Sequence, residues 1–124
     1  MQFTSTLLAL ATFATVVSAG CYTSGEGFDT DNNRGHARRA AIDLCQGQVL
    51  SGYFNQGQSK TRCADMDNNK KVDFQVVWLG KGGLTLKPSD CEWRLHNEIN
   101  GCNLGGESII ADWFFRSDPN NGRC

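Results

Sequence analysis

The chain has 124 residues, with 12 basic and 13 acidic side chains and a formal net charge of −1. This balance argues against binding nucleic acid or a membrane surface through bulk charge. No internal repeat, low-complexity tract or linker-like segment divides the chain, so we expect one globular domain after any leader segment.

Residues 1–19 have the pattern of a secretory signal peptide. An apolar run from Leu7 to Val17 ends at Val17-Ser18-Ala19, which suits a cleavage site after Ala19. The run is too short to span a bilayer, because a membrane helix needs about 20 apolar residues. A bacterial lipoprotein site at Cys21 is the alternative, but lipidation would leave an odd number of cysteines. We therefore expect a secreted, extracellular domain of residues 20–124 without a membrane span.

Six cysteines follow the leader, and an even number in an exported chain predicts three disulfides. A metal cluster is the alternative, but no Cys-x-x-Cys pair occurs and the two histidines lie far apart in sequence. We expect neither a metal nor a cofactor. The predicted disulfide cysteines are Cys21, Cys45, Cys63, Cys91, Cys102 and Cys124.

The first predicted helix spans residues 31–47. We expect Asn33 to cap it and Gly47 to end it, with Cys45 on the inner side of the last turn. Its apolar positions recur at helical spacing, at Ala37, Ala40, Ala41, Leu44 and Cys45.

Strands follow this helix. Residues 49–54 and 58–65 flank a turn at residues 55–57, which predicts a hairpin. The clearest strand signal comes next, because apolar Val72, Phe74, Val76 and Trp78 alternate with their neighbours. Residues 84–86 suit a further short strand.

A second helix is predicted from Pro88 to Gly101, with Ser89 and Glu92 forming a capping box. Cys91 and Cys102 lie at opposite ends of this helix, roughly 16 Å apart at about 1.5 Å per residue. A disulfide needs Cα atoms within about 7 Å, so these two cysteines must pair elsewhere.

The last segment, residues 109–124, predicts a central strand followed by a turn at residues 118–122 and a tail held by Cys124. Read with period two, one face of the strand carries Ile109, Ala111, Trp113 and Phe115. The other face carries Ile110, Asp112, Phe114 and Arg116.

The order of elements predicts an α+β fold of two layers, with an antiparallel sheet of about four strands and two helices on one face. The positions expected to face the helices are Leu50, Phe54, Phe74, Val76, Trp78, Trp113 and Phe115. The positions expected on the opposite, uncovered face are Tyr53, Asp73, Gln75, Asp112, Phe114 and Arg116.

This uncovered face suits a carbohydrate. A sugar ring stacks its C–H face on an aromatic side chain, and its hydroxyl groups bind carboxylates, amides and guanidinium groups. Phe114 between Asp112 and Arg116, with Gln75 nearby, supplies both kinds of group. An ordinary solvated sheet face with one exposed ring is the alternative.

Two other kinds of site have partial support in the sequence. Oxygen-bearing side chains between Asp65 and Asp73 have the spacing of a calcium loop, but Lys70 and Val76 occupy two of its essential positions, so a polar hairpin turn explains them. A small secreted ribonuclease needs a histidine near a carboxylate, whereas His36 and His96 both fall on predicted helices.

Five segments resemble a family of small secreted fungal cysteine-rich proteins, typified by the glycan-binding ink-cap mushroom lectin called Y-three. They are C-Y-T-S-G-E from Cys21, the alanine-rich helix ending at Cys45, L-S-G-Y-F from Leu50, K-V-D-F from Lys71, and D-W-F-F-R-S-D-P-N-N-G-R-C from Asp112. The last of these is the most specific. The resemblance covers nearly all of residues 20–124 and implies a single α+β domain with three disulfides that binds glycans. No site residue is taken from it.

We therefore predict a secreted, non-catalytic, lectin-like protein with a role in defence or as an effector. Its expected partners are glycans or glycoproteins, and we expect a monomer. Two alternatives stay open: an effector or killer-toxin-like protein that acts on a protein or membrane target, and a small secreted ribonuclease.

Overall fold

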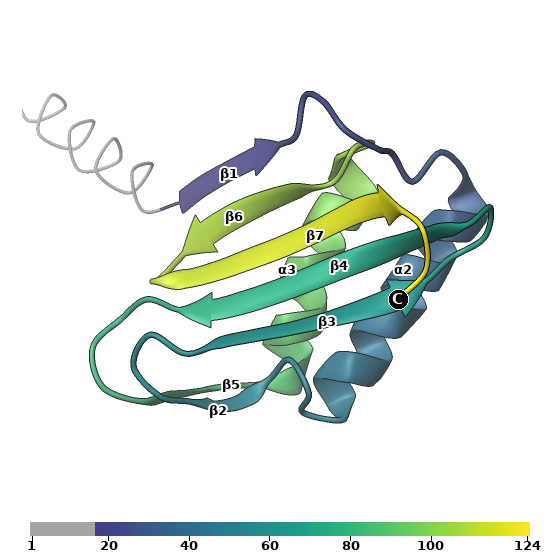
Figure 1. Ribbon diagram of the computed structural model, residues 1–124. Coiled ribbons are helices and arrows are strands. Elements are labelled where there is room, and N and C mark those ends of the chain that lie inside the picture. The colour runs from purple at the N-terminus through teal and green to yellow at the C-terminus, as the bar shows by residue number, and fades with distance from the viewer. Residues whose placement is uncertain (1–16) are drawn as a thin grey trace, which may run out of the picture.

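The computed structural model describes residues 17–124, which form two layers (Figure 1). Residues 1–16 of the predicted signal peptide lie outside the described residues. No helix in residues 17–124 has the length and apolar character needed to cross a membrane. In chain order the elements are β1 (Val17–Cys21), α2 (Asp31–Gln46), β2 (Gly52–Phe54), β3 (Ser59–Asp65), β4 (Lys70–Trp78), β5 (Leu84–Leu86), α3 (Pro88–Gly101), β6 (Gly106–Ile110) and β7 (Trp113–Asn121).

The larger sheet has five antiparallel strands in the order β1-β6-β7-β4-β3, and β2 pairs with β5 in a separate two-stranded sheet. Both helices lie behind the larger sheet, on the same face (Figure 1). The predicted α+β class with two helices on one face of an antiparallel sheet is confirmed. The larger sheet has five strands, one more than expected.

The predicted hairpin of residues 49–54 and 58–65 is wrong. β2 pairs with β5, with Tyr53 opposite Thr85, while β3 pairs with β4. The turns explain the difference, because Asn68 and Asn69 adopt positive φ values of 64° and 56°. Asparagine tolerates this conformation, so β3 reverses directly into β4. Tyr53 therefore lies outside the five-stranded sheet.

The predicted single strand from Ile109 to Arg116 is interrupted. Ala111 and Asp112 form a two-residue turn with φ values of 49° and 65°, and Ile110 pairs with Trp113 across it. Positive φ at both central residues gives the twist that fits a tight hairpin. The turn moves Ile109 to the face opposite Trp113, which corrects the predicted alternation at residues 109–112.

Strand β7 continues to Asn121, although Pro119 predicts a turn at residues 118–122. Proline cannot donate a hydrogen bond to a neighbouring strand. The pairing with β6 ends at Ser117. No hydrogen bond to β6 is therefore required from the backbone of Pro119. Pro119 still pairs with Val72 of β4.

The two helices occupy the predicted ranges to within one residue, but their N-terminal capping differs from the prediction. Thr30, and not Asn33, caps α2, and its Oγ1 accepts a hydrogen bond from the backbone N–H of Asn33 at 3.1 Å. In α3 the capping residue is Lys87, which makes no side-chain capping hydrogen bond. Pro88 at the first helical position explains this start, since the missing N–H has no partner there in any helix. The predicted capping box is therefore absent.

A single aromatic and aliphatic core fills the space between the helices and the sheet. Trp113 is central to it, with its ring centroid 5.0 Å from that of Phe54 and 4.7 Å from that of Trp78. Every position predicted to face the helices is buried, namely Leu50, Phe54, Phe74, Val76, Trp78, Trp113 and Phe115.

Three disulfides connect distant parts of the chain. Cys21 pairs with Cys102, Cys45 with Cys91 and Cys63 with Cys124. The prediction that Cys91 and Cys102 do not pair with each other is confirmed. The last bridge fixes the end of the chain beside β3, as expected for the tail. These links span 81, 46 and 61 residues, so each one removes much freedom from the unfolded chain.

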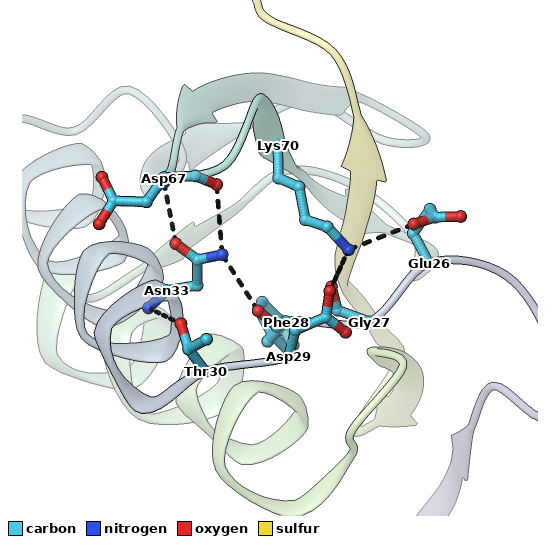
Figure 2. A network of polar contacts seen from close by, with 8 residues as sticks. All are labelled: Glu26, Gly27, Phe28, Asp29, Thr30, Asn33, Asp67 and Lys70. Atoms are coloured by element: carbon cyan, nitrogen blue, oxygen red, sulfur yellow. Dashed lines mark hydrogen bonds and ion pairs between the residues drawn. The ribbon is translucent and has the colours of Figure 1, made fainter.

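A buried lysine connects the segment before α2 to β4 (Figure 2). Lys70 is 8% exposed, and its Nζ forms ion pairs with Asp29 and, at 3.2 Å, with Glu26. The same ammonium group donates to the backbone carbonyl of Gly27 at 3.0 Å. The hydrogen bond to Asp29 raises the pKa of Lys70 above its ordinary value, which outweighs the effect of burial. This lysine is therefore charged and fully occupied within the fold.

Asn33 makes the second connection in this region (Figure 2). It is fully buried, and its Nδ2 donates to the carbonyl groups of Phe28 and Asp67 at 3.1 and 3.3 Å. Its Oδ1 accepts from the backbone N–H of Asp67 at 2.8 Å. All the hydrogen-bonding groups of this side chain are thus used to hold α2 to the β3–β4 turn.

Candidate functional site

The face of the five-stranded sheet away from the helices carries an unusual mixture of side chains. We call it the open face, and its strand register brings one set of alternating residues together on it. This set consists of Ser59, Thr61, Cys63, Asp65, Lys71, Asp73, Gln75, Val77, Glu107, Ile109, Phe114, Arg116, Asp118 and Asn120.

An apolar strip crosses the open face near the β6–β7 turn. Phe114 lies opposite Val77 of β4 and opposite Ile109 of β6. Ile109 is 39% exposed and Phe114 is partly exposed. The strip, made of Ile109, Phe114 and Val77, offers a flat apolar surface on which a ring can stack.

A polar row runs beside this strip, made of Thr61, Gln75, Arg116 and Glu107. Arg116 lies between Gln75 and Glu107 in the strand register. Its Nε is buried and has no hydrogen-bond partner within the described residues. Buried polar groups without a partner are rare in folded proteins, so this unpaired nitrogen calls for an explanation.

Two members of the row are already held in place. The Nε2 of Gln75 donates to Ser59 Oγ at 3.0 Å. Glu107 Oε1 accepts a hydrogen bond from the hydroxyl of Tyr22 at 2.8 Å. Partial burial and the neighbouring carboxylate of Glu107 raise the pKa of Tyr22 to about 12. Tyr22 therefore stays protonated at neutral pH and donates to Glu107, which orients that carboxylate.

A shallow hollow of about 300 Å³ lies next to the polar row, lined partly by Thr61, Asp73 and Arg116. Asp73 lies opposite Asp118, and Asn120 Nδ2 donates to a carboxylate oxygen of each, at 2.7 and 3.2 Å. The amide thus holds two like-charged groups side by side. Of the two, Asp73 lines the hollow together with Arg116, so the hollow has both a carboxylate acceptor and a guanidinium donor in its wall.

The structure brings together four of the six residues predicted for the site, Asp73, Gln75, Phe114 and Arg116. Tyr53 is 59% exposed but belongs to β2, outside the five-stranded sheet. Asp112 lies in the β6–β7 turn, where its carbonyl accepts a hydrogen bond from Leu79 N–H at 2.8 Å. Their predicted placement on this face is therefore wrong.

Sequence reasoning missed Glu107 and Tyr22. Glu107 and Ile109 alternate with the inward-facing Ser108 and Ile110, and this pattern indicates a strand once the turn at Ala111 is recognised. Tyr22 belongs to the quoted segment C-Y-T-S-G-E, but it lies 85 residues from Glu107 in sequence. No local pattern could have placed it against β6.

The two histidines lie on the helix layer, away from the open face. His36 Nε2 is 3.3 Å from a carboxylate oxygen of Asp67, and His96 Nε2 is 3.1 Å from the carbonyl oxygen of Arg38. Within residues 17–124 no histidine therefore joins Asp73 or Glu107 on one surface.

The calcium-like spacing from Asp65 to Asp73 belongs to the β3–β4 hairpin. Asp65 accepts a hydrogen bond from Cys124 N–H at 2.8 Å and lies 3.4 Å from Arg123. Asp67 contacts His36, as described above. Among the described residues no group of three or more histidine, cysteine or acidic side chains is arranged to hold a metal ion.

Comparison with known protein families decides the assignment. Residues 38–124 match the family model described as glycan binding domain Y3. The chain belongs to this family. The resemblance drawn from the sequence is thus confirmed, and a glycan is the partner that the family implies. A search of curated proteins found no match.

The matched region contains most of the candidate site. It covers most of α2 and every later element, and so it includes four of the five strands of the larger sheet. Tyr22 and Glu26 lie before the matched region, whereas Lys70 lies within it. The apolar strip and the polar row lie entirely within it.

Proposed function

We propose that this Y3 domain is an extracellular lectin without catalytic activity and that it binds its glycan on the open face. In this proposal Phe114 stacks on the C–H face of one sugar ring. Arg116, Gln75 and Asp73 bind hydroxyl or acetamido groups of the same or the next residue. Glu107, oriented by Tyr22, supplies a further acceptor.

One observation carries the proposal: the apolar strip and the polar row run side by side, and the Arg116 Nε in that row has no partner. A sugar offers an apolar face and several hydroxyl groups at once, so it can satisfy both surfaces in one pose. The shallow hollow beside Asp73 suits an exposed ligand better than a small apolar molecule, which needs an enclosed pocket.

The extracellular location is part of this proposal. Three disulfides are formed among the described cysteines, and such bridges persist in oxidising compartments. The predicted signal peptide at residues 1–19 and the glycan-binding family agree with export. A role in defence follows only if the recognised glycan is foreign to the producing organism.

A glycan array tests the proposal with three proteins: the wild type, Phe114→Ala and Ile42→Ala. Ile42 is 38% exposed on α2, so its truncation controls for the loss of an exposed apolar side chain on the other layer. We expect the wild type and Ile42→Ala to select the same glycans, and Phe114→Ala to lose most of the signal. Equal signals from all three proteins would place the glycan elsewhere. No signal from the wild type would contradict the lectin assignment itself.

A further inference from the structure

A second cavity of about 300 Å³ lies between α3 and β6, on the opposite side of the sheet from the open face. Its apolar wall consists of Ile110, the disulfide of Cys21 and Cys102, and the backbone of Gly20 and Gly101. A Cβ atom added at Gly101, at the end of α3, would meet no atom within 4 Å, so the space beside this residue is open.

Two polar groups without partners line this cavity. Glu98 is 4% exposed and its Oε1 has no hydrogen-bond partner in the described chain. Ser108 is 7% exposed, and its Oγ is likewise unpaired. Leaving a buried carboxyl oxygen and a buried hydroxyl unpaired is unfavourable, and such groups call for an explanation. A ligand with hydroxyl groups would satisfy both.

The protonation state of Glu98 supports the inference that a hydroxyl-bearing ligand binds here. Burial raises the pKa of the carboxyl group from 4.5 to about 7. The nearby Ser108 hydroxyl and the Arg94 guanidinium offset part of this rise, although the hydroxyl makes no hydrogen bond of regular geometry. Burial thus disfavours the ionised carboxylate near neutral pH. A ligand that donates hydrogen bonds to the carboxylate would reverse this preference.

The mouth of the cavity restricts the charge of the ligand. Arg94 lines it and stacks on Trp93, with its Cζ 4.4 Å from the ring centroid, and the exposed Asn97 lies beside it. The guanidinium disfavours a cation, and Glu98 disfavours an anion. Apolar walls, unpaired acceptors and an amide at the mouth together favour a neutral, hydroxyl-bearing ring.

We propose that this cavity is a second binding site of the domain, which takes one neutral sugar residue through hydrogen bonds from its hydroxyl groups to Glu98 and Ser108. The adjoining cavity of about 230 Å³ shares Arg94 and Ile110, so a second ring can continue along α3. This site does not depend on the open face, and either can exist without the other. Together the two would let one chain bind two glycan ends.

The proposal predicts a specific dependence on pH. Because the ligand binds the ionised form of Glu98, its affinity rises as the pH increases through 7. A single group with a free pKa of about 7 gives about a tenfold gain in affinity between pH 6 and pH 8. Besides Glu98, Arg94 is the charged side chain lining the cavity. Cleavage after Ala19 would add the amino group of Gly20 to the lining.

The test is a titration followed by amide chemical shifts in two-dimensional NMR, with the methyl glycosides of fucose, N-acetylglucosamine and N-acetylgalactosamine as probes at pH 6 and pH 8. The proteins are the wild type, Glu98→Gln and the control Glu92→Gln, a change to a glutamate on the same helix that does not line the cavity. Glutamine at position 98 has nearly the same shape as glutamate but does not titrate. If Glu98→Gln does not fold, the titration of the wild type decides alone.

We expect at least one probe to shift the amides of Gly101, Ser108 and Ile110, with about tenfold tighter binding at pH 8 in the wild type and in Glu92→Gln. Glu98→Gln should bind about equally at both pH values, near the weaker wild-type level. Shifts confined to the open face would overturn this second site and leave the proposed lectin function intact. Binding in the cavity that keeps its pH dependence in Glu98→Gln would also overturn it.

Discussion

Phe114 lies directly opposite Ile109 across the β6–β7 hairpin, and Val77 lies on its other side. This contact depends on the turn at Ala111 and Asp112, which reverses the chain within two residues. Had residues 109–116 formed one straight strand, Ile109 and Phe114 would point to opposite faces. The turn thus creates the apolar strip on which the proposed glycan site depends.

Replacing Phe114 with alanine should weaken glycan binding by about tenfold or more, which corresponds to a loss of about 1.4 kcal/mol or more of stacking and apolar contact. The side chain is only partly buried, so the free energy of unfolding should change little. Isothermal titration calorimetry with a glycan selected on the array measures the first quantity, and urea unfolding the second. Unchanged affinity would remove Phe114 from the site.

Replacing Trp113 with alanine should lower the free energy of unfolding and leave glycan binding by the folded protein unchanged. Its ring is buried against Phe54 and Trp78, and truncating a buried tryptophan costs about 3–5 kcal/mol. Urea unfolding should show this loss, while any folded fraction should still bind glycan. A stable Trp113→Ala protein that no longer binds would mean that the two faces of β7 have been assigned the wrong way round.

Asn33→Ala should destabilise the domain by about 2 kcal/mol or more, because it leaves the buried carbonyl of Phe28 and the partly buried backbone groups of Asp67 without partners. The neighbouring Asn32 is exposed, and Asn32→Ala is the matched control. Both should be compared with the wild type by urea unfolding. Similar stabilities for the two variants would show that the network in Figure 2 contributes little.

Glu98 should make the stability fall as the pH rises. Its pKa is about 7 in the folded protein and 4.5 without burial, so the folded state binds more protons than the unfolded state between these values. The free energy of unfolding contributed by this group is therefore highest below pH 4.5 and is lost between pH 4.5 and 7. The total loss is roughly 3 kcal/mol.

The difference between wild type and Glu98→Gln isolates this effect from the other carboxylates. Urea unfolding at pH 5 and pH 8 should give the wild type a steeper decline than the variant. Parallel curves for the two proteins would show that the carboxyl group of Glu98 is better solvated than its burial indicates. This measurement needs no ligand, so it is independent of the proposed second site.

The sequence predicted the core more closely than the site. Strict alternation around Phe74 and Val76 and around Trp113 and Phe115 identifies buried faces, because burial acts on every second residue of a strand. Both helices follow from apolar spacing in the same way. Their capping residues did not, since several polar residues compete at each helix start and tertiary contacts choose among them, as they do for Asn33.

What the sequence did not reveal depends on contacts between distant segments. The turn at Ala111 and Asp112 lacks the Asn-Gly pattern that usually marks a tight hairpin, so the outward positions before it were misassigned. The pairing of β2 with β5 displaced Tyr53 from the predicted site. The hydrogen bond from Tyr22 to Glu107 joins residues 85 positions apart.

The most direct test of the open-face site is to map the amide chemical-shift changes that a glycan selected on the array produces in the labelled wild-type protein. The proposal predicts that the largest changes occur at Gln75, Glu107, Phe114 and Arg116, at the centre of the five-stranded sheet. Saturable binding of that glycan with the amides of β4, β6 and β7 unchanged would contradict it.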